Sequence, residues 1–164
     1  MFMIGFAFDE VMEGKIQKTG ERFDRPFRFR VKVRTPNVVA RVAMCDAEGT
    51  LRLDGLAKDV PTTGRLELSP VFERRIRYVL DFTGDDGKKY RFDGSKSLGS
   101  GRRPLAYLES WTTLPGEVTD EQGHVWGHAV LRFSMRKHLR GLVLSVRLGR
   151  SLEQLPSRGA AHAS

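Results

Sequence analysis

Apolar and polar residues alternate with a period of two along most of the chain. The clearest run covers residues 27–34, in which four apolar residues alternate with four basic ones: Phe27, Phe29, Val31 and Val33 against Arg28, Arg30, Lys32 and Arg34. Successive side chains of a strand point to opposite faces, so this run predicts a strand with one apolar and one cationic face. Sheets with one polar face are typically antiparallel.

Turn signals separate this run from further alternating runs. Residues 76–82 and 90–92 alternate on either side of Gly84-Asp85-Asp86-Gly87, which predicts a hairpin. We expect a second hairpin to turn at Asp46-Ala47-Glu48-Gly49. Its inward-facing residues would be Ala40, Val42 and Met44 before the turn, then Leu51 and Leu53 after it. A short strand over 64–68 would end at Pro70.

The second half of the chain continues the pattern less regularly. Residues 94–104 are rich in Gly, Ser, Arg and Lys and predict a surface loop, followed by a strand over 105–113. A turn at 119–123 leads into a strand over 124–133, in which Val125, Gly127, Ala129, Leu131 and Phe133 would share one face. Ser134 predicts the start of a short helix at about 135–141, while 142–148 fits either a strand or a helix.

These elements predict an all-β domain. No helical segment is long enough for the crossover that parallel strands require. About eight to ten short strands with turns between them predict an antiparallel β-barrel, lipocalin-like in its plan, or a β-sandwich. We expect residues 1–150 to form this single domain and 151–164 to form a flexible C-terminal tail.

Composition narrows the setting of this domain. The 164 residues suffice for one core without a metal, and the single cysteine, Cys45, excludes an intrachain disulfide. No apolar run approaches the length of a transmembrane helix. The apolar start, residues 1–8, lacks a preceding positive charge and predicts a strand rather than a signal peptide. We therefore expect a cytoplasmic protein.

The net charge of +8 favours an acidic partner. Anion-binding candidates are the basic positions of the first run and of the predicted loop: Arg28, Arg30, Lys32, Arg34, Arg102 and Arg103. Nucleic acid and anionic lipid would both fit such residues. However, Phe27 and Phe29 fall on the face opposite the cations, which counts against a stacking platform for single-stranded nucleic acid.

Three short motifs resemble an accessory β domain found beside GMC-type flavin oxidoreductases of the cholesterol-oxidase-like kind. They are Phe8-x-Glu10-x-Met12-x-Gly14, then Tyr78-x-Leu80-x-Phe82 followed by Gly87, Tyr90, Gly94 and Lys96, and finally Trp111-Thr112-Thr113-Leu114. The matches run in order through residues 6–133. The resemblance implies an accessory module that contacts a lipid- or sterol-like substrate or the neighbouring enzyme. The chain has no Gly-x-Gly-x-x-Gly after a strand, so flavin binding does not carry over and no cofactor is expected.

Candidate catalytic groups are few. Glu10 would share a strand face with Phe6 and Phe8, and a carboxylate there either pairs with a basic residue such as Lys96 or acts as an acid or base with a raised pKa. His124 and His128 lack the neighbours that a metal site needs, so no metal is expected. Cys45 has no motif of a nucleophile, and we expect a half-buried, inert thiol at a strand end. No catalytic residue is assigned.

The sequence therefore favours a non-catalytic accessory or binding domain over an enzyme. It would bind a hydrophobic, lipid- or sterol-like small molecule or dock on an oxidoreductase. The candidate ligand-binding residues are Glu10, Tyr78, Phe82, Tyr90, Lys96 and Trp111. Two alternatives stay open: a basic module for nucleic acid or anionic lipid, and a small barrel enzyme that uses Glu10 as general acid or base.

Overall fold

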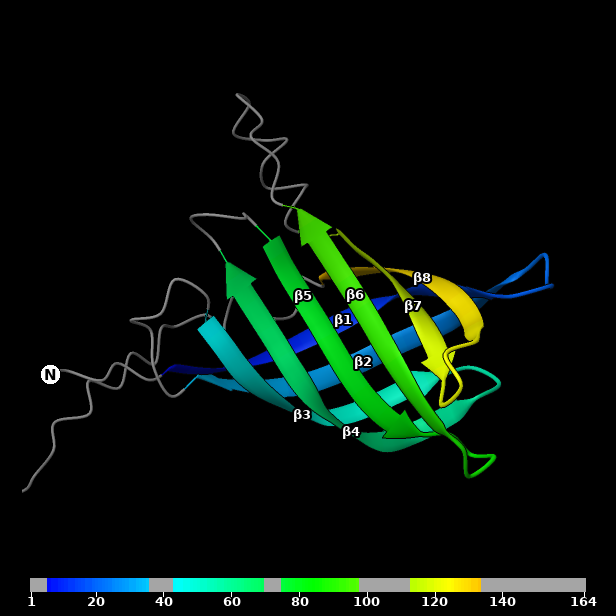
Figure 1. Ribbon diagram of the computed structural model, residues 1–164, viewed down its shortest axis with the longest axis horizontal. Coiled ribbons are helices and arrows are strands. Elements are labelled where there is room, and N and C mark those ends of the chain that lie inside the picture. The colour runs from blue at the N-terminus through cyan, green and yellow to red at the C-terminus, as the bar shows by residue number, and fades with distance from the viewer. Residues whose placement is uncertain (1–5, 36–42, 70–74, 98–112, 134–164) are drawn as a thin grey trace, which may run out of the picture.

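The computed structural model describes residues 6–35, 43–69, 75–97 and 113–133, which form a closed antiparallel barrel (Figure 1). The strands of the described residues are β1 (Phe6–Lys18), β2 (Asp24–Thr35), β3 (Ala43–Leu53), β4 (Ala57–Ser69), β5 (Arg75–Thr83), β6 (Lys89–Ser97), β7 (Thr113–Asp120) and β8 (Val125–Phe133). Each strand pairs with the next along the chain, and β8 pairs with β1. Closure leaves no unpaired edge, and it decides for the barrel over the sandwich.

The period-two pattern explains which side of the barrel each residue takes. In β2, Phe27, Phe29, Val31 and Val33 are at most 1% exposed. The four cations between them are exposed on the outer face, as the alternation predicts. The same rule places Gly127, Ala129 and Leu131 of β8 inside.

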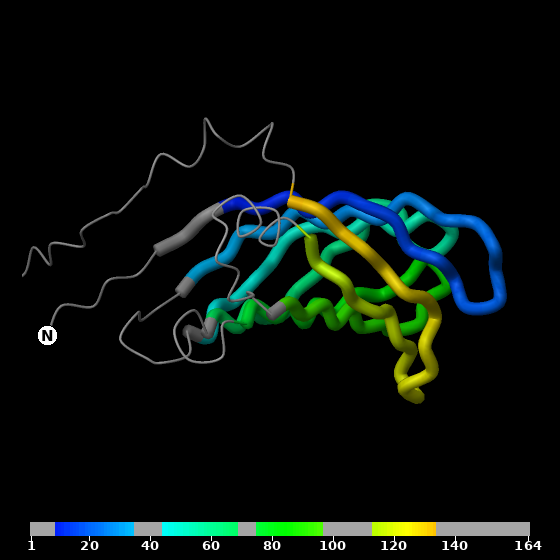
Figure 2. Tube along the Cα trace, turned by 90° about the horizontal axis from the view of Figure 1, so that it is seen from above, coloured from blue at the N-terminus to red at the C-terminus, as the bar shows by residue number. Residues whose placement is uncertain are grey.

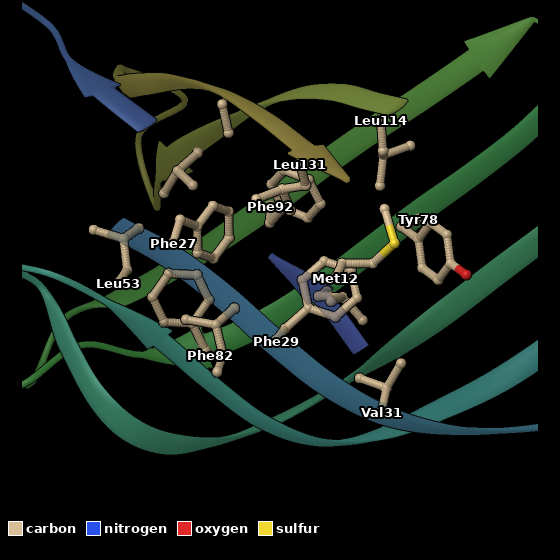
Figure 3. Packing of buried hydrophobic residues seen from close by; sticks show 14 of the residues in the cluster. Met12, Phe27, Phe29, Val31, Leu53, Tyr78, Phe82, Phe92, Leu114 and Leu131 are labelled. Atoms are coloured by element: carbon tan, nitrogen blue, oxygen red, sulfur yellow. The ribbon is translucent and has the colours of Figure 1, made fainter. Parts of the chain in front are cut away.

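Aromatic rings fill the middle of the barrel. The Phe92 ring lies 5.2 Å from that of Phe27 and 5.8 Å from that of Phe29, and Tyr78 lies 5.6 Å from Phe29, measured between ring centroids. Figure 3 shows these rings packed between the strands, with Met12 beside them. Eight-stranded barrels are just wide enough for side chains to fill, and here the middle is a packed core.

The hairpin expected at residues 46–49 is wrong. Alternation runs without a break through β3, with Cys45, Ala47, Leu51 and Leu53 buried and the residues between them largely exposed. Met44, expected inside, is 44% exposed on the outer face. Asp46 and Glu48 are outward residues of the strand opposite the basic positions of β2, which explains acidic residues in mid-strand.

The chain instead turns at Asp54–Leu56, where Gly55 has φ of +80°. That backbone region favours glycine, and the Leu56 N–H donates to the Leu53 carbonyl across the turn. Ala40 and Val42 lie outside the described residues. The expected strand over 64–68 is confirmed as part of the longer β4, which begins at Ala57.

Other expected boundaries fare differently. The turns near 84–87 and 119–123 are confirmed as the β5–β6 and β7–β8 connections. The strand expected over 105–113 meets β7 only at Thr113, and residues 105–112 lie outside the described residues. The expected helix at 135–141, the segment 142–148 and the tail 151–164 lie outside them as well.

The two ends of the barrel differ in how they connect strands. Four short turns lie at one end, toward the right of Figures 1 and 2, and we call it the turn end. At the opposite end β1 begins and β8 ends. Strands β2, β4 and β6 also end there, and strands β3, β5 and β7 begin there.

Candidate functional site

A carboxyl and a phenol meet on the inner face near the opposite end. Glu10 occupies β1 and is partly buried, whereas Tyr78 of β5 is 4% exposed. Both fall at inward positions of their strands, since Glu10 pairs with buried Val31 and Tyr78 lies two residues from buried Leu80. The Tyr78 hydroxyl donates a hydrogen bond to Glu10 Oε2.

Burial sets the protonation of this pair. Desolvation raises the pKa of Glu10 to about 7, against a smaller lowering by the bond from Tyr78. Desolvation, together with the Glu10 carboxyl, raises the pKa of Tyr78 well above its usual value. Glu10 therefore exchanges its proton near neutral pH, while Tyr78 stays a hydrogen-bond donor. Such a pair can hold a polar group of a ligand or pass a proton.

Lys96 is a second inner-face polar residue at this end. It is the last residue but one of β6, and it follows buried Phe92 and Gly94 at the same parity. Its Nζ is shielded from solvent and has no hydrogen-bond partner among the described residues. Desolvation lowers the pKa of this amine. The pairing of Glu10 with Lys96 expected from sequence is not found, because Tyr78 bonds Glu10 instead.

Apolar side chains stand beside these polar groups. Leu68 of β4 pairs with Ile76 of β5, and Ile76 pairs with Lys96, so the three form one row around the inner face. Phe133, at the end of β8, pairs with buried Met12. Leu68, Ile76 and Phe133 are partly buried and pack on the core without being enclosed by it. The opposite end thus combines an apolar surface with polar groups.

Two of the predicted ligand residues lie elsewhere. Phe82 and Tyr90 are buried near the turn end, where their rings stack at 5.7 Å. The Tyr90 hydroxyl donates to Asp86 Oδ2 at 2.6 Å, and Gly84 packs so closely that an added Cβ would lie 2.9 Å from the Tyr90 ring. Both aromatic residues help to close the turn end. Trp111 lies outside the described residues.

Three of the four basic outer positions of β2 have a carboxylate opposite them on at least one neighbouring strand. In register, Lys32 lies between Asp9 and Glu48, and Arg28 lies next to Glu13. Arg34 forms an ion pair with Glu48 at 3.4 Å, and Arg28 forms one with Asp59 at 3.8 Å. These neighbours offset much of the local positive charge. Anion binding by Arg28, Arg30, Lys32 and Arg34 stays a prediction, and Arg102 and Arg103 lie outside the described residues.

Two hollows are open grooves on the outer face. One, near the turn end, includes Thr63, Asp81, Thr83, Lys89 and Arg91. The other includes Glu13, Arg28, Arg52 and Asp54. Exposed charged residues make up part of each lining, and oppositely charged residues pair across the first, where Arg91 Nε lies 2.7 Å from Asp81 Oδ1. Phe82 and Tyr90, two of the predicted ligand residues, also line the first groove, although each is at most 7% exposed.

The histidines and the cysteine have structural surroundings. His124 bonds Asp120 in the β7–β8 turn, and His128 lies 3.9 Å from Glu117 on the outer face. Among the described residues, no group of three or more metal-ligating side chains comes together. Cys45 is fully buried within β3, not half-buried at a strand end as expected. No helix found in the described ranges meets the length and apolarity needed to traverse a bilayer.

Sequence reasoning identified Glu10, Tyr78 and Lys96 but not the apolar residues around them. Leu68, Ile76 and Phe133 read as ordinary core positions, because alternation gives the face of a strand and not the distance from the barrel end. These three residues lie near the ends of β4, β5 and β8. Knowledge of where these strands end would therefore have identified them as residues of the barrel end.

Comparison with known proteins finds no matching family model, no similar curated protein and no similar solved structure. The resemblance to the accessory domain of cholesterol-oxidase-like enzymes therefore stays a prediction. Any conclusion about function therefore rests on the geometry of the opposite end.

Proposed function

We propose that this protein is a non-catalytic binding domain that takes a hydrophobic small molecule at the end of the barrel opposite the four turns. The observation that carries the proposal is the grouping of partly buried inner-face residues there. Leu68 and Ile76 offer apolar surface, Phe133 is partly buried at the same end, and Glu10 and Lys96 lie there too. Ligand sites are typically apolar surfaces with a few convergent polar groups.

The packed middle of the barrel limits how deep the ligand reaches. A long ligand that entered the interior would need the space that is occupied by Phe29, Phe92 and Tyr78. The proposed ligand therefore lies against the end of the barrel, with its apolar part on the Leu68–Ile76 row.

The proposal is tested by titration with N-phenyl-1-naphthylamine, a neutral dye that fluoresces in apolar surroundings. We expect saturable binding with about one site per chain. The double variant Leu68→Gln/Ile76→Gln should weaken binding by roughly tenfold or more, because each change removes apolar contact worth about 1 kcal/mol.

The matched control makes the same kind of change on the outer face. Met44 and Val130 are 44% and 51% exposed there, so Met44→Gln/Val130→Gln should leave the titration unchanged. Circular dichroism and thermal unfolding check that both double variants remain folded. Dye binding that is unsaturable in the wild type, or that weakens equally in both double variants, would contradict the proposal.

A further inference from the structure

Each end of the barrel has a cationic residue at a strand position that faces inward, and the two residues have different surroundings. Near the turn end, Arg25 pairs in register with buried Ile16. Its guanidinium donates to both carboxylate oxygens of Glu21, at 2.8 and 2.9 Å. At the opposite end, Lys96 Nζ has no such acceptor within the described ranges.

A shielded ammonium without an acceptor costs free energy. The amine has lost much of its hydration, and Ile76, its neighbour in register, supplies no hydrogen-bond acceptor from its side chain. Lysine offers three donors and no acceptor, so only an acceptor, and best an anion, can compensate it. The tyrosine hydroxyl of the same end already serves Glu10. No described residue therefore supplies the acceptor that this amine lacks.

We infer that Lys96 is the anchor for the anionic head group of the ligand, so that the domain selects single-chain amphiphiles with a carboxylate over neutral ones. This inference rests on the proposed function and names the chemical class of its ligand. The head group would accept from Lys96 Nζ while the chain runs along the row of Ile76 and Leu68. A charge-assisted hydrogen bond of this kind outweighs one between neutral groups.

The experiment compares decanoate with decanol as competitors of bound N-phenyl-1-naphthylamine, at pH 8 and below the micellar range. Both are unbranched and contain ten carbon atoms, so their ratio reports chiefly the head group. In the wild type we expect decanoate to displace the dye at a concentration about tenfold lower than decanol. Lys96→Met should reduce that preference to one or below, since Glu10 is ionised at pH 8, whereas Lys96→Arg should retain it because the charge remains.

Lys89→Met is the matched control, since Lys89 begins the same strand and is exposed near the turn end. It should keep the wild-type preference. Equal displacement by decanoate and decanol in the wild type would overturn the inference while leaving the proposed function intact. A preference that survives Lys96→Met would also overturn it. Failure of the dye and both competitors to bind would instead overturn the proposed function.

Discussion

The turn end and the opposite end of the barrel treat polar groups on the inner face differently. Near the turn end, Arg25 is paired with Glu21, and the Tyr90 hydroxyl donates to the exposed carboxylate of Asp86. At the opposite end, Glu10 has a pKa raised to about 7 by burial, and Lys96 is shielded without a described partner. Groups held at such a cost are typical of functional sites, whereas satisfied groups stabilise the fold.

Under the proposed function, one end of the barrel stabilises the fold and the other binds the ligand. The turn end is closed by Leu56, Phe82 and Tyr90, all buried, and by short turns with left-handed glycines such as Gly87 at φ of +78°. The opposite end leaves Leu68, Ile76 and Phe133 partly buried beside charge. Stability and binding can then change independently, and substitutions can test that separation.

The largest expected effect belongs to the aromatic layer between the ends. Phe29→Ala removes a fully buried ring that contacts Phe27, Phe92 and Tyr78, and should lower the free energy of unfolding by about 4 kcal/mol. Ile76→Ala, at the partly buried end, should cost only about 1 kcal/mol. Urea unfolding measures both values. Equal losses would mean that the opposite end is packed as tightly as the middle.

An effect of opposite sign is expected at Glu10. Its pKa is about 7 in the folded protein and near 4.5 when unfolded, so folding favours the protonated carboxyl. The stabilisation is fully present below about pH 4.5 and is lost as the pH rises through about 7. Glu10→Gln stays neutral and still accepts from Tyr78. It should therefore stabilise the protein at pH 8, on the order of 2 kcal/mol.

Urea unfolding of the Gln variant at several pH values measures the effect, and the difference from wild type should vanish near pH 4.5. Glu48→Gln is the control on the outer face, where the carboxylate faces Arg34 at 3.4 Å. It should not stabilise the protein at pH 8. A gain for Glu10→Gln that is independent of pH would show that the carboxyl is not strained by burial.

The smallest expected effect is at Lys96. Lys96→Met replaces a shielded ammonium by an apolar chain of similar length and should stabilise the unliganded protein by about 1 kcal/mol. Lys89→Met, on the exposed part of the same strand, should change stability by less than about 0.5 kcal/mol. Thermal unfolding at pH 7 distinguishes the two. A loss of stability in Lys96→Met would show that the amine already has a stabilising partner.

The fold was largely predictable because the inner and outer faces of a barrel require the period-two pattern that the sequence displays. Residues 27–34 and the Asp86-Gly87 turn needed only local information. The region around 46–49 misled because Asp, Glu and Gly also favour turns. In β3, the two acids point outward toward the cations of β2, and Gly49 permits a close approach: a Cβ there would lie 1.9 Å from the Arg30 carbonyl oxygen.

The candidate site was predictable only in part. A carboxylate and a lysine at apolar-face positions are visible in the sequence, and so Glu10 and Lys96 were identified. The partner of Glu10 was not, because the bond between Glu10 and Tyr78 joins β1 to β5, strands that are not neighbours in the barrel. Phe82 and Tyr90 share the pattern of Tyr78 but lie near the other end, a distinction that depends on strand register rather than on residue type.

Backbone amide chemical-shift mapping with decanoate tests the separation of the two ends most directly. We expect saturable changes in amide chemical shift at residues of the opposite end, such as Leu68, Ile76 and Lys96. The amide signals of turn-end residues, such as Asp86 and Tyr90, should not shift. Shifts concentrated at the turn end or on the outer face of β2 would contradict the account.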